Sequence, residues 1–418
     1  YQRHYGLVTG DHLHFNFYSS YTLHIHIYTP IHLYFSFHFF QKKKMSPALK
    51  SENEDYHKGV KYLHEIGIQR VPKKYIFPIS ERPNFVDASK GHHNLNLPII
   101  DFSQLHGPSR AQVLESLSYA CENYGFFQLV NHGIEEEVIR RMVDVGGSFF
   151  DLPLVEREKY MTTDMTTSVR YGTSFNQTKD GVFCWRDFLK LVCQPLPHDD
   201  HLLTHWPSSP SDFREMAIAY SKETKILSMK LVEAILESLG IINVTTKTKD
   251  KTQTNDDDEE MLLKEFENGS QLMAVNFYPA CPNPDLTLGM PPHSDYGFLT
   301  LLLQDEVEGL QVKSNGDWVT IQPIPGAFVV NVGDHLEIFS NGKYKSVLHR
   351  VIVNSLKSRI SVASLHSLPF NSIIKPSPKL ISEKNPKLYK DTNFAQFLEY
   401  LKSCDSTNKS FLETRKIK

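Results

Sequence analysis

The β-rich part of this chain opens with Leu272-Met273-Ala274-Val275-Asn276-Phe277-Tyr278. Short runs rich in β-branched and aromatic residues, which favour strands, recur from this segment to residue 364. Turn residues separate these runs, which cover residues 272–278, 299–304, 310–312, 318–321, 327–332, 347–353 and 360–364. Many short strands at this spacing predict a β-sandwich or a β-barrel.

Helical patterns dominate on both sides of this region. Apolar residues recur at helical spacing over residues 58–68, 110–123, 135–150 and 213–239, with short strands predicted at 97–102 and 125–130. Helical spacing returns at residues 393–403. We therefore predict a mainly β protein with flanking helices. Its parts are an amino-terminal region of helices and strands (45–242), a β domain (270–370), and a carboxy-terminal helix and tail (371–418).

Two segments depart from this pattern. Residues 247–260 contain no apolar side chain, so we predict an acidic, disordered loop over residues 243–262. The first 44 residues hold seven of the 20 histidines and many aromatic residues, and they precede Met45. We interpret residues 1–44 as translated upstream sequence. Their apolar run is interrupted by Pro30 and falls short of the roughly 20 residues that a membrane span needs.

The bulk composition narrows the class of protein. A formal net charge of -3 over 418 residues, without a basic stripe, argues against nucleic-acid and membrane partners. The five cysteines are scattered and form no CxxC pair, which indicates a reduced, intracellular protein. We expect a cytoplasmic monomer that binds a small molecule, with the nucleus as an alternative compartment.

His293-Ser294-Asp295 and the later His349 form the most informative motif. Residues at i and i+2 of a strand share a face, so His293 and Asp295 converge if their segment is extended. Two histidines and one carboxylate occupy one face of an octahedral Fe(II) and leave the opposite face open. A histidine on an apolar strand is more often a satisfied core residue, and that alternative applies to each one taken alone.

Two further pairs of polar residues are also spaced at i and i+2, so the members of each pair share one face of a strand. Arg359 and Ser361 present a guanidinium and a hydroxyl, which together suit a carboxylate. The alternative is a structural arginine that pairs with an internal Asp or Glu. Asn276 and Tyr278 similarly present two hydrogen-bonding groups, although a strand end turned by Pro279 explains them equally well.

The complete set of motifs resembles the plant 2-oxoglutarate- and Fe(II)-dependent dioxygenases. The similarity covers roughly residues 58–402 and rests on Pro98–Asp101, Gly125–Gly133, Asn276–Pro279, His293–Asp295, Gly309–Val312, Pro325–Asp334, Ser340–Ser346, His349–Arg350 and Arg359–Ser361. Within that family, the segments Tyr171–Asn176 and Cys184–Leu189 are most similar to the downy-mildew-resistance-6-like oxygenases, a salicylate hydroxylase-like branch.

This resemblance implies a double-stranded β-helix, or jelly roll, and a set of roles. His293, Asp295 and His349 are implied to bind Fe(II). Arg359 and Ser361 are implied to bind the distal carboxylate of 2-oxoglutarate, with Tyr278 and Asn276 assisting. The implied reaction consumes O2, uses ascorbate as a reductant, releases succinate and CO2, and hydroxylates or desaturates a substrate.

The substrate is the least determined part of the prediction. The candidate pocket residues are Phe175, Ala274, Phe298 and Leu365, each of which is also an ordinary core residue by type. The many aromatic residues favour a planar phenolic acid or flavonoid. Two alternatives stay open: an ascorbate-dependent iron oxidase of the ethylene-forming type, and a non-catalytic small-molecule binding protein on the same scaffold.

Overall fold

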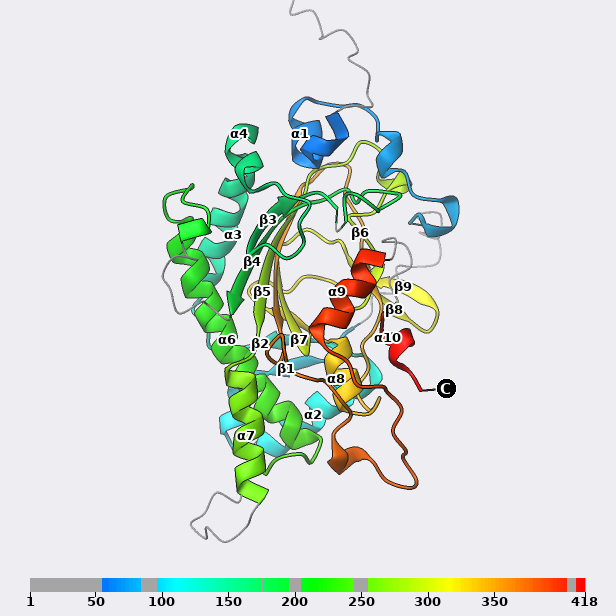
Figure 1. Cartoon of the computed structure of the whole chain (residues 1–418). Coiled ribbons are helices and arrows are strands. Elements are labelled where there is room, and N and C mark those ends of the chain that lie inside the picture. Colours follow the sequence, from blue (N-terminus) through cyan, green and yellow to red (C-terminus); the bar gives the residue numbers. More distant parts are fainter. Residues whose placement is uncertain are drawn as a thin grey trace, which may run out of the picture. The chain divides into compact units, whose positions relative to one another are not determined.

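Two β-sheets form the centre of the computed structural model, which describes residues 55–83, 96–174, 176–194, 204–243, 255–403 and 411–417 (Figure 1). In spatial order, the larger sheet contains β1 (Ile99–Asp101), β2 (Phe126–Val130), β10 (Phe328–Val332), β7 (Leu299–Gln304), β12 (Arg359–His366), β5 (Gln271–Tyr278), β4 (Asp187–Gln194) and β3 (Val169–Gly172). The smaller sheet contains β6 (Met290–His293), β11 (His349–Val351), β8 (Leu310–Ser314) and β9 (Asp317–Thr320). Residues of both sheets line one cavity, and the arrangement confirms the predicted jelly-roll class.

Alternate residues of the larger sheet serve two different faces. On β5 and β12, Val275 and Val362 pair in register and lie in the main apolar core. Their neighbours Ala274 and Ala363 also pair in register but line the cavity. Because successive side chains of a strand point to opposite faces, this sheet separates the apolar core from the cavity.

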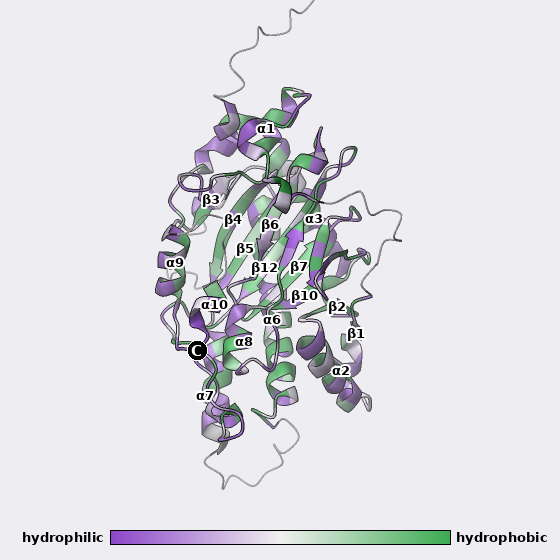
Figure 2. Cartoon of the chain, turned by 90° about the vertical axis from the view of Figure 1, so that its right-hand side faces the viewer, coloured by the Kyte–Doolittle hydropathy of each residue, from purple (hydrophilic) through white to green (hydrophobic). Residues whose placement is uncertain are grey.

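Three long helices pack against the core side of the larger sheet: α2 (Arg110–Asn123), α3 (Glu136–Asp151) and α6 (Phe213–Ser238) (Figure 1). The core that they complete contains Met142 and Phe149 of α3 and Leu231 of α6. Much of the sheet is coloured as hydrophobic in Figure 2. The helix positions therefore follow from the apolar face that each helix buries against the strands.

Shorter helices surround this framework. They are α1 (Val60–Glu65), α4 (Leu154–Arg157), α7 (Asn255–Glu267), α8 (Asp334–Phe339), α9 (Phe394–Ser403) and α10 (Phe411–Arg415). Single 3-10 turns lie at Asp55–Lys58, Lys73–Tyr75, Ile79–Glu81, Phe102–His106, Glu158–Tyr160, Pro284–Leu286 and Pro378–Leu380. Residues Asp55–Lys418 form one compact unit, so the predicted amino-terminal and β regions share a core.

The helices predicted at residues 110–123, 135–150 and 213–239 are confirmed as α2, α3 and α6, with bounds that differ by at most one residue. The strands β3 and β4 were not predicted from the sequence. On β4, Phe188, Lys190 and Val192 alternate with more deeply buried residues, which is the period-2 pattern that identifies a strand.

The prediction of a disordered loop over residues 243–262 is wrong for its second part, because α7 begins at Asn255. Leu262 and Leu263 pack against the core and Phe266 is buried, so this helix has an apolar side that the acidic segment alone lacks. Acidic residues also favour the first turns of a helix, where the dipole is positive. Residues 244–254 and the leader predicted at residues 1–44 lie outside the described residues.

Candidate active site

His293, Asp295 and His349 come together at one wall of the cavity. His293 ends β6 and pairs in register with His349 on β11. Oδ1 of Asp295 lies 3.7 Å from Nε2 of His293 and 3.8 Å from Nε2 of His349. The candidate ligand atoms all lie within 4.8 Å of one another, which is close enough to hold one metal ion. The donor set fits Fe(II) and leaves coordination positions open.

The strand pleat explains only part of this convergence. The sequence argument places His293 and Asp295 on one strand, whereas β6 ends at His293 and Asp295 belongs to the loop that follows. The backbone of that loop is fixed by a 2.7 Å hydrogen bond from Asp334 N to the Asp295 carbonyl. Gly333 permits this close approach, because a Cβ at that position would collide with the carbonyl oxygen of Gly297.

Backbone carbonyls orient both imidazole rings. Nδ1 of His293 lies 2.9 Å from the carbonyl oxygen of Pro291, and Nδ1 of His349 lies 3.3 Å from that of Val347. A carbonyl oxygen only accepts hydrogen bonds, so these contacts select the tautomer with the proton on Nδ1. Nε2 of each ring then presents its lone pair beside Asp295, as metal binding requires.

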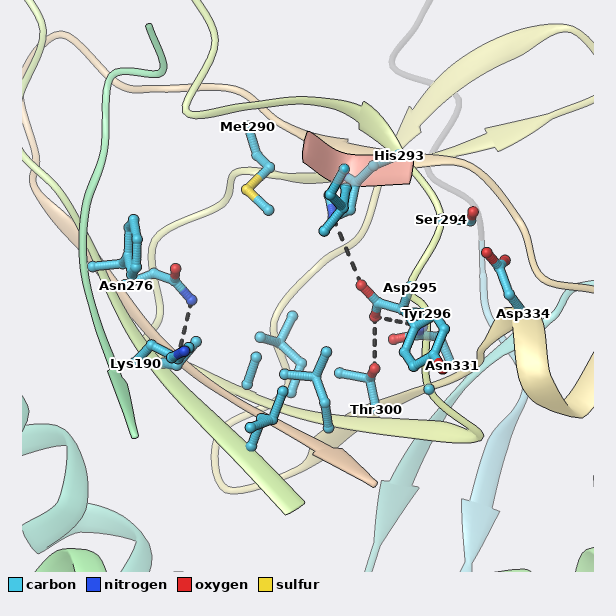
Figure 3. Close-up of a pocket in the computed structure, with 18 of the residues that line it drawn as sticks. Lys190, Asn276, Met290, His293, Ser294, Asp295, Tyr296, Thr300, Asn331 and Asp334 are labelled. Atoms are coloured by element: carbon cyan, nitrogen blue, oxygen red, sulfur yellow. Dashed lines mark hydrogen bonds and ion pairs between the residues drawn. The ribbon is translucent and has the colours of Figure 1, made fainter. Parts of the chain in front are cut away.

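The carboxylate of Asp295 is held from the other side by the larger sheet. Its Oδ2 accepts hydrogen bonds from Oγ1 of Thr300 at 2.6 Å and from Nδ2 of Asn331 at 2.9 Å (Figure 3). Thr300 and Asn331 pair in register on β7 and β10. Burial opposes ionisation of Asp295, but the charge of His349 and His293 in their protonated form and the two hydrogen bonds keep its pKa below the ordinary value. Asp295 is therefore fixed as an anion with Oδ1 directed at the histidines.

Arg359 forms a separate cationic end of the same cavity. Its guanidinium donates to the Val307 carbonyl at 3.1 Å, to Oε1 of Gln304 at 2.9 Å and to Oγ of Ser361 at 3.4 Å. The ring of Tyr278 lies 5.1 Å from the guanidinium carbon. Among the described residues, no Asp or Glu forms a salt bridge with Arg359. Its charge does act on Asp305, whose carboxylate accepts hydrogen bonds from the backbone N–H groups of Val307 and Ile360.

Asn276 lies between this cationic end and the strands β3 and β4. Its Oδ1 accepts a hydrogen bond of 3.1 Å from Arg186, which also contacts Sδ of Met290 at 2.8 Å. Nδ2 of Asn276 donates to the Ala274 carbonyl at 3.2 Å. Asn276 and Tyr278 both line the cavity, so the structure brings all four residues predicted to contact 2-oxoglutarate to one space.

The cavity has a volume of about 510 Å³ and is mostly apolar. Figure 3 shows Asp295, Thr300 and Asn331 on one side, with Lys190 and Asn276 across the cavity from them. Aromatic side chains of the carboxy-terminal helices close another side. Phe397 of α9 stacks on Tyr296 with ring centroids 3.9 Å apart, and Phe411 of α10 contacts Phe397. Such a space suits a small, largely apolar molecule with a few polar groups.

The four residues predicted to contact the substrate lie in different places. Ala274 and Leu365 line the cavity. Phe298 does not: it is buried in the core, where its ring packs 4.6 Å from Phe266, so its prediction as a pocket residue is wrong. It precedes the first residue of β7, and strand alternation therefore does not fix its direction. Phe175 lies outside the described residues.

Sequence reasoning missed the charged residues on β3 and β4. Arg170 on β3 and Lys190 on β4 line the cavity, although no sequence motif marked them. Arg186, just before β4, also lines it, and the segment Cys184–Leu189 contained it only as a sign of the family branch. The signal was present for Lys190, because it is the one charged residue in an alternating run that otherwise carries Phe188 and Val192 on the same face. A cation on the inner face of a strand is unusual and points to a functional or paired role.

Comparison with known proteins agrees with this geometry. Residues 269–367 match the 2OG-Fe(II) oxygenase superfamily, and residues 97–209 match the amino-terminal region described as non-haem dioxygenase in morphine synthesis. Protein DMR6-LIKE OXYGENASE 2 of Arabidopsis thaliana is 39% identical over 79% of this chain and 90% of its own length. Flavanone 3-dioxygenase 2 of Oryza sativa subsp. japonica is 40% identical over 78% of this chain and 89% of its own length.

A solved structure gives the same result in three dimensions. The crystal structure of JOX2 in complex with 2OG, Fe and JA superposes with a TM-score of 0.72 and 35% identity, covering 86% of this chain and 98% of JOX2. The fold and the site thus define a non-haem iron oxygenase of the jelly-roll type. The chain belongs to the 2OG-Fe(II) oxygenase superfamily, and its relatives include the DMR6-like oxygenases. It is a 2-oxoglutarate-dependent dioxygenase with iron as cofactor.

Within the described residues, no helix is long and apolar enough to span a bilayer.

Proposed function

We propose that this dioxygenase binds Fe(II) through His293, Asp295 and His349, and oxidises a small aromatic metabolite such as a phenolic acid or a flavonoid. The observation that carries the metal assignment is the cluster of the three ligand atoms within 4.8 Å, with both Nε2 atoms facing Asp295. When bound, iron and 2-oxoglutarate supply the oxidising power from O2, with succinate and CO2 as co-products.

The chain's own residues bind and orient the reactants. Arg359 and Ser361 hold the distal carboxylate of 2-oxoglutarate, because a buried guanidinium that forms no salt bridge is stabilised by an anionic ligand. Thr300 and Asn331 keep Asp295 ionised and aimed at the metal position. The aromatic side chains of α9 and α10 exclude water from the substrate side of the cavity.

Two observations favour an aromatic substrate. First, aromatic rings of the carboxy-terminal helices line one side of the cavity. Second, the larger sheet contributes small residues such as Ala274 and Ala363, which leave space for a flat ring. The relative named flavanone 3-dioxygenase 2 supports a flavonoid-like substrate. The reaction at the substrate is hydroxylation or desaturation.

Substitution of a metal ligand provides the direct test. Asp295→Ala should lower the affinity for Fe(II) by more than about 100-fold, because it removes one of three ligands, and should abolish turnover while the protein stays folded. Metal affinity is measured by titration, turnover by succinate release, and folding by circular dichroism. The control Asp317→Ala removes an exposed carboxylate from the same small sheet and should bind iron normally. Normal iron binding by Asp295→Ala would refute the metal assignment.

A screen for succinate release identifies the substrate and the reaction type. Phenolic acids and flavonoids are incubated with holoenzyme, 2-oxoglutarate, O2 and ascorbate. We expect succinate in a 1:1 ratio to an oxidised product for at least one aromatic compound. Turnover of a substrate without any 2-oxoglutarate would instead favour an ascorbate-dependent oxidase, and binding without turnover would favour a non-catalytic binding protein.

A further inference from the structure

Two cations face each other across the edge of the larger sheet. Arg170 on β3 and Lys190 on β4 are direct cross-strand partners, and both line the cavity. Arg170 is only 3% exposed. Like charges directly opposite one another on a sheet are destabilising, and the cost grows in a poorly solvated cavity. Such a pair calls for a compensating interaction.

The protein supplies backbone acceptors to both cations. Nζ of Lys190 donates to the Met165 carbonyl at 2.9 Å. The guanidinium of Arg170 donates through Nε to Thr162 at 3.0 Å and through Nη2 to Ser174 at 3.2 Å. Among the described residues, neither cation forms a salt bridge with a carboxylate. Carbonyl dipoles alone compensate a buried charge only partly, so both side chains retain capacity for an anion.

Two carboxylates that interact with this pair form hydrogen bonds within their own loops. Asp180 and Asp164 both act on the pKa of Arg170 from a distance. Oδ2 of Asp180 accepts hydrogen bonds from Oγ of Ser174 and from the backbone of Asn176. Oδ1 of Asp164 accepts two hydrogen bonds from Thr166. Both carboxylates favour the charged form of Arg170, and Asp164 also favours that of Lys190, but neither forms a salt bridge with these cations.

An aromatic ring fixes the direction of the Arg170 guanidinium. The ring centroid of Phe188 lies 5.2 Å from the guanidinium carbon of Arg170 and 4.7 Å from that of Arg186. Contact of this kind with an aromatic ring orients a planar guanidinium. Burial, followed by the charge of Arg170, lowers the pKa of Lys190 to about 8. Lys190 is thus still mostly protonated at neutral pH, and an anion beside it would favour that form.

Small residues of the larger sheet leave open space in the cavity between this cation pair and the metal site. Lys190, Ala274, Ala363 and Leu302 are successive cross-strand neighbours on β4, β5, β12 and β7, and all four line the cavity. Three inter-strand spacings separate the first strand from the last, or about 14 Å. The two alanines leave the middle of this row open. Figure 3 shows Lys190 across the cavity from Asp295 and Thr300.

We propose that Arg170 and Lys190 form an anion subsite that binds the carboxylate of the substrate. The substrate is then a small aromatic acid whose acid group lies against β3 and β4 while its ring extends over Ala274 and Ala363 toward the metal site. This inference rests on the proposed function, in which Arg359 is occupied by 2-oxoglutarate. It narrows the substrate class from aromatic metabolites in general to acids.

Equilibrium binding separates this subsite from turnover. Holoenzyme with Fe(II) and 2-oxoglutarate is titrated calorimetrically without O2, using 4-hydroxybenzoate and 4-hydroxycinnamate, each paired with its neutral primary amide. We expect at least one acid to bind more tightly than its amide. Lys190→Met should weaken binding of that acid by about tenfold or more, while its amide changes by less than about twofold. Arg170→Met should have the same selective effect, and it tests the subsite independently.

Lys225→Met is the matched control. Lys225 is another partly buried lysine that donates to two backbone carbonyls, those of Phe266 and Gly269, but it does not line the cavity. This variant should leave the preference for acid over amide unchanged. The proposal is overturned if no acid binds more tightly than its amide. It is also overturned if the cavity variants weaken acid and amide equally, which would indicate that the cations only hold the loop at residues 162–168.

The binding test of the anion subsite and the succinate-release test of the proposed reaction can fail independently of each other. Selective acid binding without succinate release from any aromatic compound would preserve the anion subsite and refute the proposed oxidation. Coupled oxidation of a neutral flavonoid, with no preference for acids, would preserve the proposed oxidation and refute the subsite.

Discussion

Arg359 shows how single residues would prepare this cavity for an anionic co-substrate under the proposed function. Gln304, Val307 and Ser361 each accept one of its hydrogen bonds, and Tyr278 lies against its guanidinium. These contacts fix the plane of the guanidinium before any ligand binds. A planar, pre-oriented fork is the geometry that recognises a carboxylate with two parallel hydrogen bonds. A lysine at this position would keep the charge but lose that geometry.

At this scale we predict that Arg359→Lys raises the KM for 2-oxoglutarate by about tenfold or more, with a smaller effect on kcat. Succinate release at varied 2-oxoglutarate concentrations measures both constants. Arg350→Lys is the control, because Arg350 is also a buried arginine of a strand but bonds to Gln311 and stacks on Trp318 outside the cavity. An equal KM for the wild type and Arg359→Lys would contradict the role in co-substrate binding.

At the scale of elements, α1 is fastened to the larger sheet by a carboxylate from another part of the chain. Asp187 on β4 is fully buried and accepts hydrogen bonds from the backbone N–H groups of Val60 at 2.9 Å and Lys61 at 3.1 Å. Tyr171 donates a third at 2.7 Å. Asp187 thus satisfies free N–H groups in the first turn of α1, as a local N-cap residue would. Gly59 leaves the space for it, because a Cβ there would lie 2.6 Å from Oδ2 of Asp187.

Asp187→Ala should therefore lower the free energy of unfolding by about 1–3 kcal/mol, because it leaves buried donors without partners. Chemical denaturation measures the change. Asp151→Ala is the comparison: Asp151 contacts the Lys61 ammonium of the same helix at 2.7 Å, but its side chain is 73% exposed. A surface pair of this kind contributes roughly 0–1 kcal/mol. Equal losses in the two variants would show that burial of Asp187 is unimportant.

At the scale of the whole molecule, the core buries histidines that must stay neutral. His335 on α8 and His366 on β12 are both nearly inaccessible, and burial lowers each pKa from 6.5 to about 3. An unfolded chain binds a proton at these positions with an ordinary pKa. Between pH 6.5 and pH 3 the unfolded state therefore binds more protons, and the stability contribution of a neutral buried histidine is lost as the pH falls.

We predict that His335→Gln loses about 2 kcal/mol less stability than the wild type between pH 7 and pH 5. Denaturant titrations at the two pH values give the difference directly. The comparison with the wild type is needed because burial raises the pKa of Asp334 to about 7, and that carboxyl acts with the opposite sign. His106→Gln, at an exposed position, should keep the wild-type difference. If His335→Gln and the wild type lost the same free energy of unfolding between pH 7 and pH 5, His335 would not be the buried neutral histidine that we propose.

Short strands in the sequence predicted a β-sandwich or β-barrel, the family resemblance specified the jelly roll, and helical spacing predicted the three long helices. Local patterns suffice there because each strand or helix repeats its own period. The metal-ligand geometry needed the fold, since Asp295 approaches the histidines from a loop that is fixed by Gly333 and Asp334. The three residues of the motif do lie together, although its strand-pleat explanation covers only His293.

Only the tertiary structure decided which other side chains reach the cavity. Phe298 precedes its strand and turns into the core, whereas Lys190 faces the cavity because β4 pairs with β5. The pairing of β4 with β5 joins partners as far apart as Asp187 and Phe277, and strand register across such a separation is not encoded in a local pattern. The sequence by itself therefore determined the chemistry of the oxidation. The fold alone placed Arg170 beside Lys190, because their proximity depends on the register of β3 against β4, two strands that no sequence pattern predicted.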